Sequence, residues 1–155
     1  MYDDQIPQEV DPETGLPIGP ELVSAAPAKL PQRTVLKGRY CRLEPLEPQR
    51  HGDELYLAST PPDAAVRFRY LPVPAPTSRE AFDEWLTEAA QSEDPLCFAV
   101  IDERTGRVEG RQTLMRITPA QQCIEIGNIY WGPAISQSVV TTEANFLFAR
   151  YVFEE

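Results

Sequence analysis

The residues of this chain whose types and spacing could support chemistry gather between positions 123 and 142. In the strand-like part of this segment, apolar residues follow each other at intervals of two, three and two: Ile124, Ile126, Ile129 and Trp131. A regular strand cannot place all four on one face, but one extra residue at Gly127-Asn128 can, which is the mark of a β-bulge. A bulge leaves a backbone N–H without a ladder partner, and such a donor can bind a carbonyl oxygen or a developing oxyanion. A bulge that only adjusts the twist of the sheet fits the same spacing.

The loop after this strand, GPAISQSVVT, leads into a predicted helix over residues 142–153, with Thr141 or Thr142 as its N-cap. A helix N-terminus presents unpaired N–H groups and a partial positive charge, so strand, loop and helix start could together bind an anion. The loop adds three polar side chains: Ser136, Gln137 and Ser138. Most helices begin after such loops without binding an anion, so this pattern alone has little specificity.

Predicted strands hold these residues in place. They cover residues 96–101, 108–117 and 123–131. Thr105-Gly106 supplies a tight hairpin between the first two, and TPAQQ joins the last two, so we expect an antiparallel meander. An earlier strand begins near Thr34 and bends or bulges at Gly38.

Helical periodicity predicts the remaining elements. EPQRHGDELYLAS has Pro48 near its first turn, and a short helical piece follows over residues 64–68. After LPVPAPTS, Thr77 and Glu80 have capping-box spacing, and four apolar residues recur at helical intervals: Phe82, Trp85, Leu86 and Ala89. This order predicts a mixed α/β (α+β) fold, with helices packed on a mostly antiparallel sheet.

Residues 1–33 have a different composition from the rest of the chain. They hold six of the sixteen prolines and show neither helical nor strand periodicity. We interpret them as an acidic, proline-rich arm, either without fixed structure or laid across the domain or a partner, and residues 34–155 as one domain. Four isolated apolar residues favour the second reading: Leu16, Ile18, Leu22 and Val23.

The composition of the chain limits the partners and locations that it can have. The net charge of −10 disfavours nucleic acid and anionic membranes as partners and fits a cationic or amine substrate better. We find neither a run long enough to span a membrane nor a classical signal sequence. The three widely spaced cysteines, Cys41, Cys97 and Cys123, are expected to be reduced and buried in strands, which favours a cytoplasmic location. We expect no metal.

Four segments in this order resemble the Gcn5-related N-acetyltransferase (GNAT) superfamily, in its ribosomal-protein-alanine acetyltransferase-like branch. These segments are GRYCRLEPL, EDPLCFAVID followed by TGRVEGRQTLMRI, CIEIGNIYWGPAISQS, and TTEANFLFARYVFEE. The resemblance implies an acetyl-CoA-dependent N-acetyltransferase in which an acceptor amine attacks the thioester directly. The acceptor would be a small-molecule amine or a protein N-terminus.

The resemblance also implies roles for residues. The bulged strand pairs with the pantetheine arm of acetyl-CoA and polarises the thioester carbonyl, which corresponds here to Asn128, Ile129, Tyr130 and Trp131. The pyrophosphate cradle corresponds to residues 136–142, namely Ser136, Gln137, Ser138, Val139, Val140, Thr141 and Thr142. Tyr130 could instead serve only in packing.

Glu125 is the first candidate for the base that deprotonates an ammonium group. It is predicted on the strand face opposite Ile124 and Ile126, two residues before the bulge. The alternative is a structural carboxylate paired with Arg111 or Arg116. We expect the lone histidine, His51, to be solvated rather than catalytic.

The sequence departs from the family pattern in two ways. Ser136, Val139 and Thr141 replace the usual polar and small residues of the pyrophosphate loop, and Glu143 would repel a pyrophosphate unless turned away. A further strand, helix and hairpin of the family fold are also lacking, so we expect a C-terminally truncated domain, or one that a second copy or another chain completes. A non-catalytic remnant that binds CoA or a protein is the alternative function.

Overall fold

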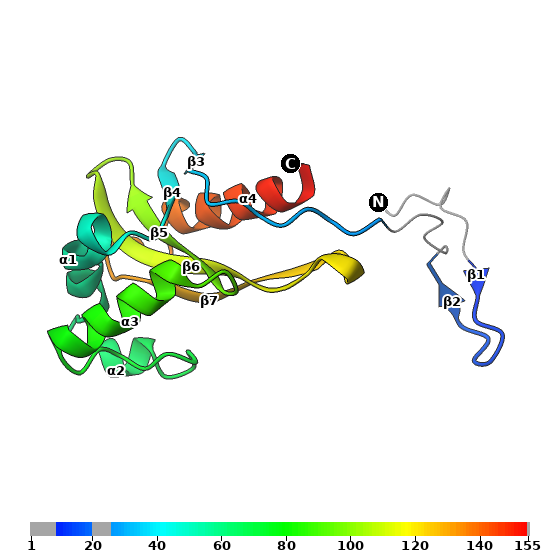
Figure 1. Cartoon of the computed structure of the whole chain (residues 1–155), viewed down its shortest axis with the longest axis horizontal. Coiled ribbons are helices and arrows are strands. Elements are labelled where there is room, and N and C mark those ends of the chain that lie inside the picture. Colours follow the sequence, from blue (N-terminus) through cyan, green and yellow to red (C-terminus); the bar gives the residue numbers. More distant parts are fainter. Residues whose placement is uncertain (1–8, 20–25, 155) are drawn as a thin grey trace.

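The computed structural model describes residues 9–19 and 26–154, and its centre is a five-stranded antiparallel sheet of order β3-β4-β5-β6-β7 (Figure 1). The strands are β3 (Leu36–Lys37), β4 (Cys41–Pro45), β5 (Leu96–Asp102), β6 (Arg107–Thr118) and β7 (Cys123–Trp131). The helices are α1 (Pro48–Ser59), α2 (Ala64–Arg67), α3 (Arg79–Gln91) and α4 (Val139–Glu154), with a short turn η1 (Pro119–Gln121). The predicted mixed α/β fold and its meander are confirmed. The strand expected from Thr34 with a bend at Gly38 is instead two strands, β3 and β4, that pair as a hairpin.

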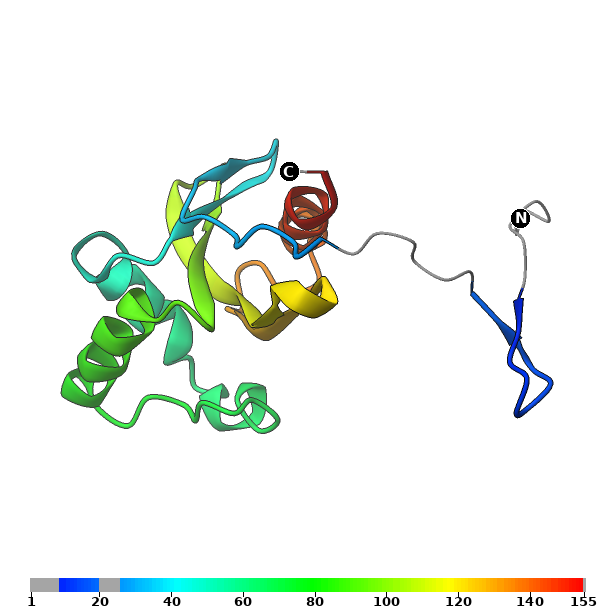
Figure 2. The same cartoon turned by 45° about the vertical axis from the view of Figure 1, so that its right-hand side comes forward.

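Helices cover both faces of the sheet, with α4 on one side and α1 and α3 on the other (Figure 2). Alternate residues of β5 divide between the two cores: Phe98 and Val100 pack with Phe148 of α4, whereas Ala99 and Ile101 pack with the other helices. This alternation is what a strand buried on both faces must show. The central strand therefore fixes the two layers relative to each other.

Two helices begin at other residues than the sequence predicted. The N-cap of α3 is Ser78, not Thr77, and its hydroxyl accepts a hydrogen bond from the Ala81 N–H at 3.1 Å. Helix α4 begins at Val139, three residues before the predicted start at Thr142, because the Ser138 hydroxyl accepts the backbone N–H two residues on, at 3.2 Å. In both segments several Ser and Thr residues stand close together, so propensity alone could not select the cap.

A carboxylate at the start of α4 holds this helix against the turn between β3 and β4. Glu143 accepts backbone N–H groups from Arg39, Tyr40 and Cys41 at 2.8, 2.6 and 2.8 Å. A side chain at Gly38 would collide with the same carboxylate. The hairpin turn is therefore shaped around a residue about a hundred positions later in the chain.

Burial corrects two sequence predictions. His51 is buried rather than solvated: its Nδ1 accepts the Glu47 N–H at 3.0 Å, so Nε2 carries the proton and donates to Glu44 at 3.1 Å. Cys41 and Cys97 are buried as predicted, and burial raises the pKa of the Cys41 thiol to about 12. Cys123 is exposed, because it directly follows the turn that joins β6 to β7.

Part of the proline-rich arm lies against the domain. The Ala28 N–H donates to the Pro119 carbonyl at 3.0 Å, and the Arg33 guanidinium donates to the Ser92 carbonyl at 2.6 Å. Farther upstream, β1 (Glu9–Val10) and β2 (Pro17–Ile18) pair in a small hairpin that the sequence did not predict, in which Ile18 is exposed. Leu16 is exposed as well, and Leu22 and Val23 lie outside the described residues.

None of the helices in residues 9–19 and 26–154 is long and apolar enough to cross a membrane.

The Glu143 contact makes stability depend on pH. Burial opposes ionisation of this carboxyl group, but the N–H groups of Arg39, Tyr40 and Cys41 outweigh it and hold the pKa below the usual 4.5. The contribution to stability is therefore complete above pH 4.5 and is lost as the pH falls through the lowered pKa. Glu143→Gln should lower the free energy of unfolding at pH 7 by about 1–3 kcal/mol, measured by urea denaturation.

Glu154→Gln, at the exposed end of the same helix, is the control and should change the free energy of unfolding by less than about 0.5 kcal/mol. If Glu143→Gln lowered the free energy of unfolding as much at pH 3 as at pH 7, the result would contradict the assigned contact.

Candidate functional site

Strand β7 carries the bulge that its apolar spacing predicted. Thr113 of β6 lies opposite Gly127, and Arg111 lies opposite Tyr130, so two steps along β6 correspond to three along β7. Asn128, at the extra position, has a φ of 48°. This left-handed conformation is one that asparagine adopts more readily than most residues. The predicted bulge at Gly127-Asn128 is confirmed.

Two side chains of β6 hold the bulge by binding its carbonyl groups. The Thr113 hydroxyl donates to the Gly127 carbonyl at 2.9 Å, and Arg111 Nη1 donates to the Asn128 carbonyl at 2.9 Å. Both side chains belong to buried residues. The carbonyls that leave the ladder at the bulge are thus paired again, as buried backbone groups must be.

The intervening residue of β6 ties the same region to α4. Gln112 is fully buried, and its Nε2 donates to the Ala144 carbonyl at 3.0 Å. Positions 111–113 therefore link the bulge and the first turns of α4 through three consecutive polar side chains. The sequence signal was present, since three polar residues in a row interrupt a predicted strand, but our sequence analysis did not use it.

The two aromatic side chains that follow the extra residue lie on opposite faces, as neighbours on a strand do, and the extra residue decides which face each one takes. Tyr130 is 2% exposed, stacks on Phe68 at 4.3 Å between ring centroids and donates its hydroxyl to the Ala58 carbonyl at 2.6 Å. Burial raises the pKa of this phenol to about 12. Trp131 packs against the α4 core. The Tyr130 side chain is thus used in packing, and its backbone lies opposite Arg111 in the ladder with β6.

The far edge of β7 has no neighbouring strand among the described residues. The Gly132 N–H donates to the Glu109 carbonyl of β6 at 2.7 Å. Because backbone groups alternate in direction along a strand, the N–H of Trp131 faces the open edge, as does that of Ile129 two residues earlier. The bulged strand therefore presents fixed donors on this side.

The loop that follows turns back on the end of β7. The Ser136 hydroxyl lies 3.1 Å from the Trp131 carbonyl and 3.0 Å from that of Gly132, and accepts Arg67 Nη1 at 3.2 Å. The single Ser136 proton is therefore already used. Arg67 rather than Ser136 could therefore contact a ligand, because it brings positive charge to the loop. Its side chain also pairs with Asp63 at 2.9 Å. The sequence analysis missed it, although Arg67 is a cation in a strongly acidic chain.

The first turn of α4 offers backbone donors. Among the described residues, no oxygen accepts a hydrogen bond from the backbone N–H of Gln137, Val139 or Thr141. The side chains of Val140 and Thr141 are buried, and the Thr141 hydroxyl donates to the Ser138 carbonyl at 2.9 Å, so these positions can act only through their backbone. The turn thus has the unpaired N–H groups that an anion needs.

Glu125 lies two residues before the bulge and pairs with Arg116 at 2.9 Å. Its side chain is 45% exposed, and that of Arg116 is 74% exposed. A side chain at Gly127 would meet the Glu125 carboxylate, which places both residues on one face. The structural pairing considered from the sequence is therefore present, with Arg116 rather than Arg111.

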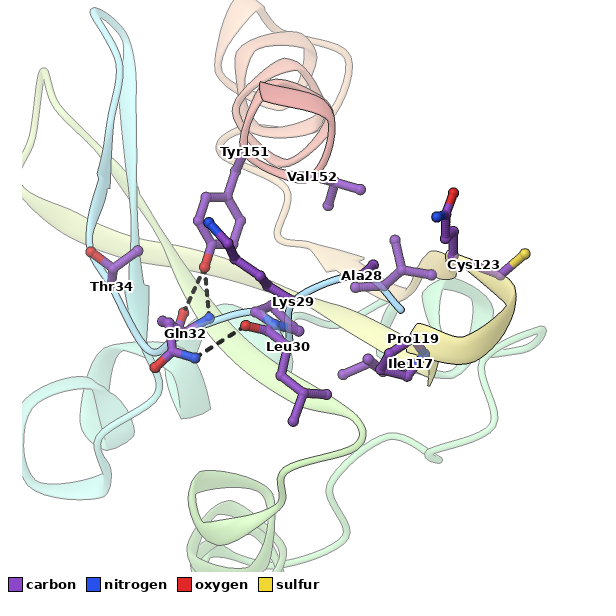
Figure 3. Close-up of a pocket in the computed structure, with 13 residues that line it drawn as sticks. Ala28, Lys29, Leu30, Gln32, Thr34, Ile117, Pro119, Cys123, Tyr151 and Val152 are labelled. Atoms are coloured by element: carbon purple, nitrogen blue, oxygen red, sulfur yellow. Dashed lines mark hydrogen bonds between the residues drawn. The ribbon is translucent and has the colours of Figure 1, made fainter. Parts of the chain in front are cut away.

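Two hollows adjoin this region. The larger, about 720 Å³, lies between the arm, the β6–β7 turn and α4, where the Gln32 N–H donates to the Tyr151 hydroxyl at 2.6 Å (Figure 3). None of the predicted cofactor residues lines it, so we place the candidate site at the bulge, which has the donors. The smaller hollow, about 180 Å³, lies between the α2–α3 loop, α3 and β6. No group of three or more metal-ligating side chains occurs in the described part of the chain.

Comparison with known proteins agrees with this geometry. Residues 41–155 match the family model described as the acetyltransferase (GNAT) domain. The chain is similar to a GCN5-related N-acetyltransferase from Brucella melitensis, with 55% identity and a TM-score of 0.81, over 83% of this chain and 58% of that one. No significant match was found among proteins of curated function.

Two further structures share the fold. One, described as a probable GNAT acetyltransferase from Chromobacterium violaceum, is 25% identical with a TM-score of 0.78, over 90% of this chain and 69% of that one. A GNAT acetyltransferase from Bacillus anthracis is 14% identical with a TM-score of 0.63, over 78% and 67% of the two chains, and shows the fold alone.

The left-handed backbone at Asn128 can be tested through stability. Asn128→Ala should lower the free energy of unfolding by about 1 kcal/mol, because the left-handed conformation is unfavourable for alanine. Asn128→Gly should lower it by less, because glycine adopts this conformation readily. Urea denaturation measures both. Asn145→Ala, within α4, is the control and should be neutral or stabilising, since alanine is the better helix former. Equal losses for the alanine and glycine variants would contradict the bulge geometry.

Proposed function

This chain belongs to the GNAT acetyltransferase family, and from this we propose that it transfers an acetyl group from acetyl-CoA directly to a primary amine. One observation supports the proposal above all others. The bulged strand, with donors facing its open edge, is joined by the loop of residues 132–138 to a helix start whose N–H groups are unpaired. A thioester and a pyrophosphate, joined by an extended arm, need these two kinds of donor.

The residues present fit acetyl-CoA. The N–H groups of Ile129 and Trp131 would bind the pantetheine arm and the thioester carbonyl, and those of Val139 and Thr141 would bind the pyrophosphate. Val139 replaces a small residue of the family pattern, but its side chain is 57% exposed and does not fill the turn. The repulsion expected from Glu143 is relieved, because its carboxylate points to the β3–β4 turn.

Orientation and charge stabilisation are sufficient for this reaction. Acetyl-CoA supplies an activated acyl group, so the chain's own groups must place the acceptor amine against it and stabilise the oxyanion. Favourable orientation contributes about 7–11 kcal/mol. One oxyanion donor contributes about 3–4 kcal/mol, and the rigid β7 backbone supplies such donors without reorganisation.

We further propose that the protein acts in the cytoplasm and that another segment or chain pairs with the open edge of β7 before the bulge, over residues 123–127. Two buried thiols without disulfides suit a reducing compartment. An unpaired strand edge is a template for further pairing.

Arg67 provides a test of the pyrophosphate site. Arg67→Gln should weaken acetyl-CoA binding about tenfold or more, because charge-assisted hydrogen bonds contribute about 1.5–3 kcal/mol. It should change binding of acetyl-pantetheine, which lacks the pyrophosphate, by less than about twofold. Titration calorimetry measures both ligands, and Arg69→Gln, an exposed neighbour, is the control. No binding of acetyl-CoA to the parent protein at millimolar concentration would overturn the proposal.

We propose that Glu125 acts as the base, directly or through a water. Glu125→Gln should lower the transfer rate most at low pH, where the acceptor is protonated, and leave the Kd of acetyl-CoA nearly unchanged. The measurement is the pH profile of the rate, with the exposed Glu88→Gln on α3 as the control. A uniform loss at all pH values, accompanied by a lower unfolding temperature, would instead assign Glu125 a structural role with Arg116.

A further inference from the structure

The smaller hollow, of about 180 Å³, has one charged side chain in an otherwise mostly apolar wall. Phe68, Phe82 and Trp85 supply aromatic surface, the α2–α3 loop supplies prolines, and Arg111 of β6 is the charged residue of the lining. Ligand sites are commonly apolar pockets with a few fixed polar groups. This hollow has that composition on a small scale.

Arg111 has a donor that the protein does not use. The residue is 1% exposed; its Nη1 binds the Asn128 carbonyl, but its Nη2 is buried without any partner in the described part of the chain. No carboxylate of the described residues pairs with it. The guanidinium lies 4.7 Å from the ring centroid of Trp85, a neutral neighbour.

A buried charge without an ionic partner is costly, and proteins seldom retain one without a use. Burial lowers the pKa of Arg111 to about 10, so the side chain remains charged at neutral pH. Holding the bulge needs only Nη1, and a neutral donor such as that of Thr113 binds the adjacent carbonyl. The cation and its free nitrogen therefore require another explanation.

We propose that this pocket binds the carboxylate of the acceptor, through Arg111, and so selects small amino-acid-like amines with an apolar side chain. This assignment rests on the proposed acetyl transfer. A carboxylate accepts from arginine in a planar, charge-assisted geometry that no neutral group matches. The volume equals that of about six water molecules, which suits one small apolar group with its carboxylate rather than a larger ligand.

The pocket is also correctly placed for an acceptor. Arg111, which lines the pocket, also holds the Asn128 carbonyl at the bulge, so a carboxylate bound by this guanidinium would bring the neighbouring amine to the strand that would bind the thioester.

Fluorescence of Trp85 tests this proposal without acetyl-CoA. The chain has two tryptophans, and Trp131→Phe leaves Trp85, in the pocket wall, as the single reporter. We expect L-leucine to bind this protein at least about tenfold more tightly than L-leucinamide, which lacks the carboxylate. The net charge of −10 favours the cationic amide in general, so a preference for leucine isolates the local cation.

In the same background, Arg111→Gln should reduce the preference to about twofold or less, and Arg111→Lys should retain part of it. Arg107→Gln, an exposed arginine on the same strand, is the control for net charge and should leave the preference unchanged. Far-UV circular dichroism checks that each variant is folded. If Arg111→Gln does not fold, the comparison of leucine with leucinamide in the parent protein still tests the proposal.

Equal affinity for leucine and leucinamide in the parent, or an unchanged preference in folded Arg111→Gln, would overturn the carboxylate site. Either result would leave acetyl-CoA binding at the bulge, measured separately by calorimetry, unaffected.

Discussion

The structure of the candidate site depends on the side chains of residues 111–113 of β6, which fix an irregular stretch of β7. The guanidinium of Arg111 and the hydroxyl of Thr113 bind the two carbonyls released by the bulge, while Gln112 binds a carbonyl of α4. Without these bonds, buried backbone groups would be left unpaired, at a cost comparable to a lost hydrogen bond each. Because the bulge shifts the phase of β7, Trp131 packs against the α4 core, Tyr130 is buried on the opposite face, and the N–H of Trp131 faces the open edge.

The start of α4 is fixed from the other side of the molecule. Ser138 caps the helix, and Glu143 anchors its first turns to the β3–β4 hairpin, so the unpaired N–H groups of the first turn hold a constant position beside the end of β7. The anchoring carboxylate would otherwise oppose an anion at this end of the helix. The fold thus uses a negative charge for stability and turns it away from the N–H groups where we propose that the pyrophosphate binds.

The sequence predicted the features that repeat along the chain and missed those that depend on distant contacts. Apolar periodicity located the other strands of the domain sheet and its helices, and its interruption after Ile126 located the bulge, but the hairpin of β3 and β4 was taken for one strand bent at Gly38. The cap of α4 was misplaced, because the SQSVVTT segment offers several capping residues and only packing selects one. The partner of Glu143 is about a hundred residues away. The burial of His51 and Arg111 and the exposure of Cys123 likewise follow from tertiary packing.

The central claim is that the open edge of β7 and the first turn of α4 form one site for acetyl-CoA. Amide chemical shifts in ¹⁵N-labelled protein, followed while acetyl-CoA is added, test it most directly. The account predicts saturable shifts at Ile129, Trp131, Val139 and Thr141 with a single Kd, and little change at Val10 and Ile18 in the distant β1–β2 hairpin. Shifts confined to the residues that line the larger hollow, such as Gln32 and Tyr151, with β7 and α4 amides unchanged, would contradict it.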